Sequence, residues 1–263
     1  MYYSTFQIRM LYLNQMAKQA KKSSLKPKIQ KVKAKFFATY YSNPAKDLKV
    51  IAVTGENGRA TTAHYIQEIV KSRDPKVGLI IDPKSTSDLY KQLFKVWRSG
   101  TDHVIITAPS QAIANHLFYQ LPFFAIVVTN TSTTAVQDEE IKSILFNKEP
   151  YFAILNHDDP NYALFSSFPS KSATLSYGHQ NEADLRINRS KLYKMGTEAN
   201  LAFQSEKFDV ATYLTGEENV DYMAAAALTA MAIGLDSDAI VDGIANYEPA
   251  KAANPTTNDY SQF

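Results

Sequence analysis

The chain has 263 residues, of which 45% are hydrophobic and 21% are charged, a balance typical of a globular protein with a substantial core. It contains no cysteine, which excludes disulfides and thiolate metal sites. Residues 1–40 carry nine of the 28 Lys and Arg residues and none of the 26 Asp and Glu residues. A basic arm on a mildly acidic body indicates an acidic partner, a membrane surface or a nucleic acid, or else a solvated basic helix.

Residues 1–35 are predicted to form a basic amphipathic helical arm, interrupted near Lys26 and Pro27 and resuming into the aromatic run Phe36–Tyr41. Residues 1–16 are apolar and aromatic, but Arg9 and several amides interrupt them, so no run is long enough to span a bilayer. A secretory signal is not expected either, because no basic segment precedes a clean apolar stretch. We therefore expect a cytoplasmic protein without a transmembrane segment.

From Leu48 onward, short β-branched runs alternate with helical patterns. Strands are predicted at Leu48–Thr54, Val77–Asp82, His103–Thr107, Phe123–Thr129 and Tyr151–Asn156, and helices at Thr61–Lys71, Ser87–Ser99, Ala112–Tyr119 and Asp138–Phe146. Successive βα units predict a doubly wound α/β domain, in which a mostly parallel sheet carries helices on both faces.

The pattern changes after about residue 170, where several short strands with turns predict a small antiparallel extension. These strands are Ala173–Tyr177, Leu185–Lys194, Ala199–Gln204 and Lys207–Leu214. The alanine-rich segment 219–234 predicts a helix that Gly234 ends as a C-cap, and Ser237–Ala245 predicts a last helix. Residues 249–263 are predicted to form a polar tail.

The segment Gly55–Thr61 joins the first strand to the first helix of this domain. A glycine-rich turn at such a junction directs backbone N–H groups and a helix N-terminus at an anion. The usual phosphate loop ends in Gly-Lys-Ser/Thr, whereas Arg59 and Ala60 occupy those positions here. Arg59 can contact phosphate as a planar fork, but Ala60 cannot bind magnesium. A tight turn that holds no nucleotide is the alternative interpretation.

The segment Val50–Tyr65 resembles the signature of the Mur ligase family, and within it that of the UDP-N-acetylmuramoyl-tripeptide synthetases. Further blocks resemble the family in the same order: Phe36–Pro44, His103–Asn130, Phe152–Pro160, Ser176–Gly178 with Ala183–Arg186, and Asn219–Leu235. The resemblance implies that residues 36–248 form the ATP-binding central domain of that family. It also implies that ATP and magnesium are the cofactors.

Carried over position by position, the resemblance implies a set of nucleotide-binding residues: Gly55, Asn57, Gly58, Arg59, Thr61 and Asn130. The family's metal-binding hydroxyl, glutamate and histidine fall on Ala60, Thr107 and Ala135, so no metal ligand is expected there. Lys142 matches the family's carbamoylated lysine, or is an ordinary surface lysine. Tyr222 takes the place of the asparagine that contacts adenine in the family. Because of these replacements, we assign no residue a catalytic role.

These replacements predict a degenerate, stand-alone central domain that binds ATP by family resemblance but is catalytically impaired. The family's N-terminal domain, which binds the UDP-sugar, and its C-terminal domain have no counterpart in the sequence, so another protein chain could supply them. The alternative is a non-catalytic scaffold whose basic arm, residues 1–35, binds an acidic partner, a membrane surface or a nucleic acid. Asp158 and Asp159 form either a carboxylate pair or a turn before Pro160.

Overall fold

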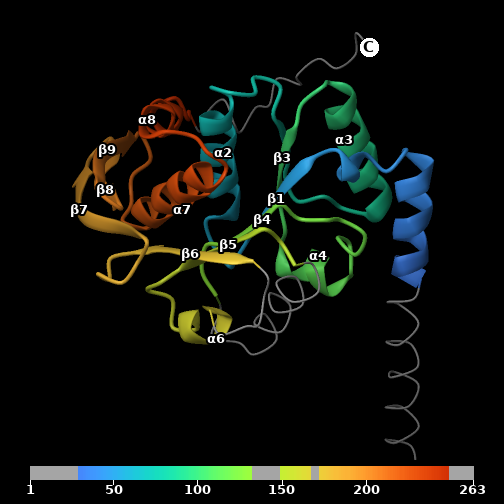
Figure 1. Cartoon of the computed structure of the whole chain (residues 1–263), viewed down its shortest axis with the longest axis horizontal. Helices are drawn as coiled ribbons and strands as arrows, with labels where there is room; N and C mark the ends of the chain where they lie inside the picture. The colour runs from blue at the N-terminus through green and yellow to red at the C-terminus, as the bar shows by residue number, and fades with distance from the viewer. Residues whose placement is uncertain (1–28, 132–148, 167–171, 249–263) are drawn as a thin grey trace, which may run out of the picture.

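The computed structural model describes residues 29–131, 149–166 and 172–248. Within these ranges, nine strands form one sheet in the order β2-β3-β1-β4-β5-β6-β7-β8-β9 (Figure 1). The strands are β1 (Lys49–Thr54), β2 (Gly78–Ile80), β3 (His103–Thr107), β4 (Ala125–Val128), β5 (Phe152–Asn156), β6 (Ala173–Gly178), β7 (Leu185–Tyr193), β8 (Gly196–Phe203) and β9 (Glu206–Thr212).

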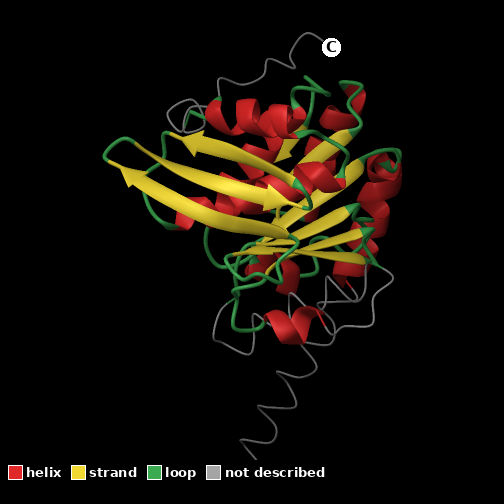
Figure 2. Ribbon diagram, turned by 60° about the vertical axis from the view of Figure 1, so that its left-hand side comes forward, coloured by secondary structure: helices red, strands yellow, loops and turns green. Residues whose placement is uncertain are grey.

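Helices cover both faces of this sheet. They are a helix over residues 29–40, η1 (Pro44–Lys46), α2 (Arg59–Val70), α3 (Thr86–Arg98), α4 (Ser110–Ala114), α6 (Tyr162–Ser166), α7 (Glu218–Ala232) and α8 (Ser237–Ala245). Figure 1 shows α2, α7 and α8 grouped on one side, and α3, α4 and the helix 29–40 on the other. Figure 2 shows the long strands of the antiparallel extension reaching beyond the parallel part.

Strand β1 shows how the sequence builds these layers. Successive side chains of a strand point to opposite faces. Ile51 and Val53 belong to the core cluster beneath α2, α7 and α8, whereas Val50 and Ala52 belong to the cluster beneath α3 and α4. All four are fully buried, which is why this central strand is a continuous apolar run. The predicted doubly wound α/β fold is confirmed.

One strand was assigned to the wrong part of the sheet. Residues Ala173–Tyr177 were predicted in the antiparallel extension, but β6 pairs with β5 in parallel, from Phe152 opposite Ala173 to Asn156 opposite Tyr177. A connection of many residues lies between β5 and β6, so the chain can return to the same end of the sheet. The antiparallel part begins with β7 and β8, which a tight turn joins.

The helix predicted at Ala112–Tyr119 is shorter than expected. It ends at Ala114, and His116 has a left-handed φ of 54°, which a continuing α-helix does not allow. The helix 29–40 runs across position 35 without a break. The helix predicted at Asp138–Phe146, most of the arm 1–35 and the tail 249–263 lie outside the described residues.

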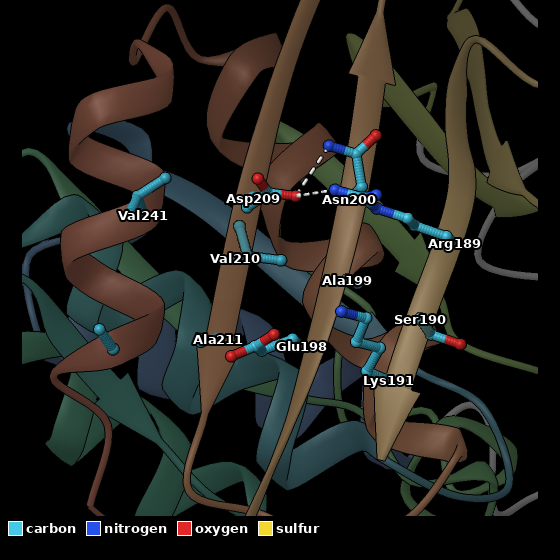
Figure 3. Close-up of a pocket in the computed structure, with 11 residues that line it drawn as sticks. Arg189, Ser190, Lys191, Glu198, Ala199, Asn200, Asp209, Val210, Ala211 and Val241 are labelled. Atoms are coloured by element: carbon cyan, nitrogen blue, oxygen red, sulfur yellow. Dashed lines mark hydrogen bonds and ion pairs between the residues drawn. The ribbon is translucent and has the colours of Figure 1, made fainter. Parts of the chain in front are cut away.

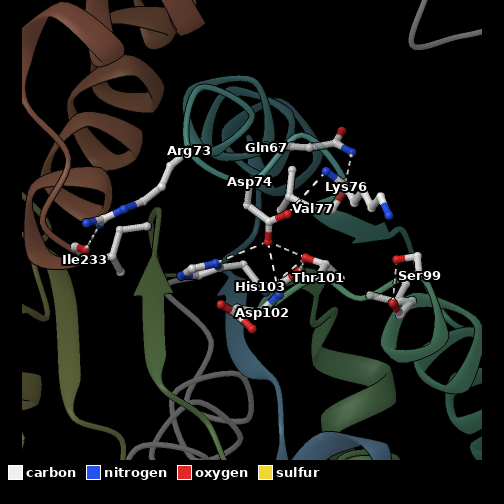
Figure 4. A network of polar contacts seen from close by, with 11 residues as sticks. Gln67, Arg73, Asp74, Lys76, Val77, Ser99, Thr101, Asp102, His103 and Ile233 are labelled. Carbon is white, nitrogen blue, oxygen red and sulfur yellow. Dashed lines mark hydrogen bonds and ion pairs between the residues drawn. The ribbon is translucent and has the colours of Figure 1, made fainter.

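A polar network holds the end of the sheet opposite the glycine loop (Figure 4). Asp74 accepts hydrogen bonds from the hydroxyl of Thr101 and the backbone N–H of Asp102, and the ring of His103 lies 3.4 Å away. Burial alone would raise the pKa of Asp74, but these hydrogen bonds outweigh it and hold the pKa below its ordinary value. Burial lowers the pKa of His103. The network joins the end of α2 to the start of β3 and is structural.

We predict that Gly243→Ala destabilises the fold where α8 crosses α2. A Cβ at Gly243 would lie 2.4 Å from the Cα of Ile69, a backbone atom that cannot move aside alone. The gain of about 1 kcal/mol in helix propensity is outweighed by overpacking of about 1–3 kcal/mol. Denaturant unfolding should show a net loss, whereas Asp242→Ala at the exposed neighbouring position should change stability by no more than about 0.5 kcal/mol. Equal midpoints for the two variants would contradict this packing.

Candidate functional site

The loop between β1 and α2 requires glycine at two positions. Gly55 and Gly58 have φ angles of 133° and 77°, which side chains disfavour. A Cβ at Gly55 would lie 2.1 Å from Oγ1 of Thr129, and one at Gly58 would lie 2.0 Å from the ring of Tyr222. The loop is therefore enclosed by the end of β4 on one side and by α7 on the other.

The side chain of Asn130 fastens this loop to the end of β4. Its Oδ1 accepts hydrogen bonds from the backbone N–H groups of Glu56, at 2.8 Å, and Asn57, at 3.0 Å. Thr129 adds a hydrogen bond from its hydroxyl to the carbonyl of Asn57, at 2.6 Å. The structure thus brings Asn130 together with the loop, and two of the N–H groups of the loop are already satisfied by protein.

The guanidinium of Arg59 lies back over its own loop. Its Nη1 donates to the carbonyl oxygens of Gly55, at 2.5 Å, and Glu56, at 2.9 Å, while its Nε is buried without a hydrogen-bond partner. In this position the side chain of Arg59 stabilises the conformation of the loop.

The N-terminus of α2 is open. The first helical hydrogen bond runs from the N–H of Thr62 to the carbonyl of Gly58, so the N–H groups of Arg59, Ala60 and Thr61 have no acceptor within the helix. Gly58, the N-cap residue, has no side chain to cap them, and the first turn contains no acidic residue. These groups and the helix dipole favour an anion at this point.

The described positions that correspond to the family's metal ligands carry other side chains, Ala60 and Thr107. Ala60 is exposed and has no side-chain oxygen. The hydroxyl of Thr107 donates to Oδ1 of Asp82, at 2.8 Å, and accepts from the backbone N–H of Asp82, at 2.7 Å. Across the described residues, no three His, Asp or Glu side chains form a group that could hold a metal ion. Ala135 and Lys142 lie outside the described residues. Of the positions that the structure describes, neither Ala60 nor Thr107 offers magnesium a free oxygen ligand.

The start of α7 places Tyr222 against the loop and Asp221 near His179 and Asp158. Burial raises the pKa of Asp221 to about 6, an effect that nearby His179 opposes and Asp158 and Glu217 reinforce. Its Oδ1 is buried without a hydrogen-bond partner. Tyr222 packs its ring on Gly58, and burial raises the pKa of its hydroxyl.

The two neighbouring aspartates have separate structural partners. Asp159 accepts hydrogen bonds from the N–H and hydroxyl of Thr131 and from the N–H of Asn161, which makes the turn expected around Pro160. Asp158 accepts a hydrogen bond from the backbone N–H of His179, at 2.6 Å, and lies 3.1 Å from its ring nitrogen.

Two pockets lie away from this loop. One of ≈ 690 Å³ opens between the helix 29–40, the segment before α3, and α4. Another of ≈ 340 Å³ lies on the antiparallel extension beside α8, lined by Arg189, Lys191, Glu198 and Asp209 (Figure 3). In Figure 3 Asn200 donates to Asp209 across the two strands, at 2.8 Å. None of the residues Gly55–Thr61 lines either pocket.

A parallel sheet with a glycine loop between its central strand and an uncapped helix defines an α/β domain of the phosphate-loop type. Comparison with known proteins identifies the family. The profile of the Mur ligase middle domain matches residues 53–230. The chain belongs to the Mur ligase middle-domain family.

The chain is similar to several ligases. The chain is 28% identical over 235 residues to the UDP-N-acetylmuramoyl-L-alanyl-D-glutamate–2,6-diaminopimelate ligase of Bacillus licheniformis, over 78% of this chain and 48% of the relative. A solved structure of a ligase with the same name superposes with a TM-score of 0.66 at 24% identity, over 75% of this chain and 46% of that one. The MurF ligase of Thermotoga maritima in complex with ADP superposes with a TM-score of 0.64 at 18% identity, over 82% and 52%. The chain therefore spans about half the length of these relatives.

The sequence singled out the loop and Asn130, but it missed Thr129, which donates to the loop, and the polar residues Asp82 and Asp221. Thr129 and Asp82 are the last residues of two predicted strands, and Asp221 lies near the start of a predicted helix. Polar residues at the carboxyl ends of parallel strands are the signal that could have found Thr129 and Asp82.

We predict that Asp221→Asn stabilises the protein in a pH-dependent way. Because the pKa of Asp221 is about 6 in the folded state and near 3.8 when unfolded, its stabilising contribution is complete below pH 3.8 and is lost as the pH rises through 6. The asparagine variant should therefore gain about 1–3 kcal/mol at pH 8 and much less near pH 4. Denaturant unfolding at both pH values measures this, with the exposed Asp238→Asn as control. A gain that does not depend on pH would contradict the assignment.

Proposed function

We propose that this chain is a nucleotide-binding Mur ligase middle domain that holds phosphate without magnesium and does not carry out ligation. The observation that carries the proposal is the open N-terminus of α2, beside a loop that Asn130 and Arg59 fasten. The N–H groups of Arg59, Ala60 and Thr61 would bind the terminal phosphates of ATP or ADP.

The protein's own contacts limit how a phosphate can bind. The N–H groups of Glu56 and Asn57 already donate to Asn130, so they do not add to the phosphate contacts unless that side chain moves. Arg59 is committed to two carbonyl oxygens. The affinity would therefore come from one helix turn and its dipole, which favours weak binding.

Ligation needs more than a phosphate site. Acyl-phosphate formation depends on magnesium to neutralise the charge of the transferred phosphoryl group. Neither Ala60 nor Thr107, whose hydroxyl is occupied by Asp82, provides the ligand that this ion needs. The loss of a single charge-stabilising group commonly costs about 3–4 kcal/mol of transition-state stabilisation.

The base would be recognised weakly. Tyr222 presents an aromatic ring instead of a side-chain amide next to the loop, and that ring already covers Gly58. A ring can contact the flat face of any base, whereas an amide can distinguish base edges by their donors and acceptors. We infer that adenine and guanine nucleotides bind with similar affinity.

The relatives carry sequence that this chain does not match, since the alignment with the Bacillus licheniformis ligase covers 48% of that protein. We propose that the binding of a UDP-sugar or an amino acid, if it accompanies this domain, belongs to a separate protein chain. Co-purification from native cells, with this chain tagged, tests this part of the proposal: recovery of such a chain supports it, and recovery of this chain alone contradicts it.

Calorimetric titration with ATP, ADP and GDP, each with magnesium and with a chelator, tests the phosphate site. We expect dissociation constants of about 0.1–1 mM, within about threefold of one another whether or not magnesium is present. Thr61→Glu should weaken binding about tenfold, because a carboxylate in the first turn accepts the free N–H groups and repels phosphate.

Gln111→Glu, which adds the same charge at an exposed position in the first turn of α4, is the matched control and should leave the affinity nearly unchanged. No heat at millimolar nucleotide would refute nucleotide binding. A rise in affinity of more than about tenfold with magnesium, or release of phosphate from ATP above the rate in buffer, would refute the metal-free, non-catalytic site.

A further inference from the structure

The helix 29–40 exposes an apolar stripe on the side that faces away from the sheet. Its members are Ile29, Val32, Phe36 and Tyr40, with exposed fractions of 51%, 68%, 61% and 69%. Spacings of three and four residues place them on one face of the helix. The rings of Phe36 and Tyr40 stack along it with their centroids 6.1 Å apart. Packing among the described residues does not explain four exposed apolar side chains in one line.

The opposite face of the same helix is already used. Ala34 and Ala38 are buried at 0% and 6% exposure, and Tyr41 just beyond the helix packs its ring 5.6 Å from that of Phe94 in α3. The helix is therefore held in place by α3, and the stripe is a second apolar face that the described part of the chain leaves uncovered.

Lysines border the stripe on both sides. At about 100° per residue, Lys33 falls on one flank and Lys35 on the other, and both are exposed. The ammonium group of Lys31 lies over the ring of Tyr119, 4.6 Å from its centroid, in a cation–π contact. No Asp or Glu occurs in residues 1–40.

We propose that this stripe docks on the surface of an anionic lipid bilayer. Aromatic and aliphatic side chains would enter the boundary between headgroups and acyl chains, while Lys33 and Lys35 would reach the lipid phosphates. In this proposal the helix 29–40 lies in the plane of the membrane surface with its stripe toward the lipid. Among the described residues no helix is long and apolar enough to cross a bilayer.

The shape and charge of this face favour lipid over a folded partner. Figure 1 places the helix 29–40 at the outer edge of the molecule, beside α3. A folded protein needs a matching groove to receive the apolar face of such a helix, whereas a lipid surface accepts an amphipathic helix directly. The lysines on both flanks, with no acidic residue on this helix, complement the negative charge of anionic headgroups.

Co-sedimentation of the full chain with vesicles tests the proposal. Vesicles of phosphatidylcholine with about 30% phosphatidylglycerol should bind the protein, pure phosphatidylcholine should bind it at least about tenfold less, and about 1 M salt should release it. The double variant Phe36→Ser/Tyr40→Ser should lose binding about tenfold or more. The matched control is Leu192→Ser/Met195→Ser in the β7–β8 hairpin, where the two side chains have exposed fractions of 55% and 82%. This variant should bind vesicles like the unchanged protein.

A second variant separates charge from apolar contact and protects against a folding artefact. Lys33→Gln/Lys35→Gln should weaken vesicle binding about fivefold for each lysine without altering the thermal unfolding midpoint. Equal binding to neutral vesicles, or full binding by the Phe36/Tyr40 variant, would overturn the proposal. So would a protein dimer, detected by light scattering, that the Phe36/Tyr40 variant abolishes while vesicles bind nothing. RNA binding that depends on the lysines alone, without vesicle binding, would overturn it as well.

Discussion

The hydrogen bonds from the N–H groups of Glu56 and Asn57 to Asn130 are the contact on which the candidate site depends. They join the first βα turn to the end of β4, two segments that are far apart in sequence. With that turn fixed, Gly58 can hold its left-handed conformation and start α2 in the right direction. The open end of α2 then faces the carboxyl edge of the sheet, where ligands of open α/β sheets bind.

The same contacts are the basis of the proposed difference in chemistry between this domain and what its family resemblance implies. Asn130 accepts from two N–H groups of the loop, Arg59 donates to two of its carbonyl oxygens, and the hydroxyl of Thr107 donates to Asp82. These polar groups serve the local structure. Under the proposed function, one turn of helix with free N–H groups is left to attract phosphate, and neither Ala60 nor Thr107 offers a free ligand to a metal ion. We therefore propose that a stable fold and a weak phosphate site coexist here without ligation chemistry.

Much of this fold could be predicted from the sequence, because apolar runs and glycine turns act locally. The run Leu48–Thr54, the loop after it and the cap at Gly234 were all confirmed within a residue or two. The direction of β6 could not be predicted, since it depends on the connection from β5 and not on its own residues. The contact of Tyr222 with Gly58 also escaped prediction, because it joins segments distant in sequence. The inward position of Arg59 is local, with partners at Gly55 and Glu56, but the hydrophobic pattern does not specify which way a polar side chain turns. The second apolar face of the helix 29–40 became evident only once its first face was seen to be packed.

Amide NMR of the labelled protein during titration with ADP can test the proposed phosphate site, because it reports on each N–H group of the loop. We predict that the signals of Arg59, Ala60 and Thr61 shift, that those of Glu56 and Asn57 stay in place while they donate to Asn130, and that magnesium adds no further change. Shifts of Glu56 and Asn57 comparable to those of Thr61, or shifts that require magnesium, would contradict it.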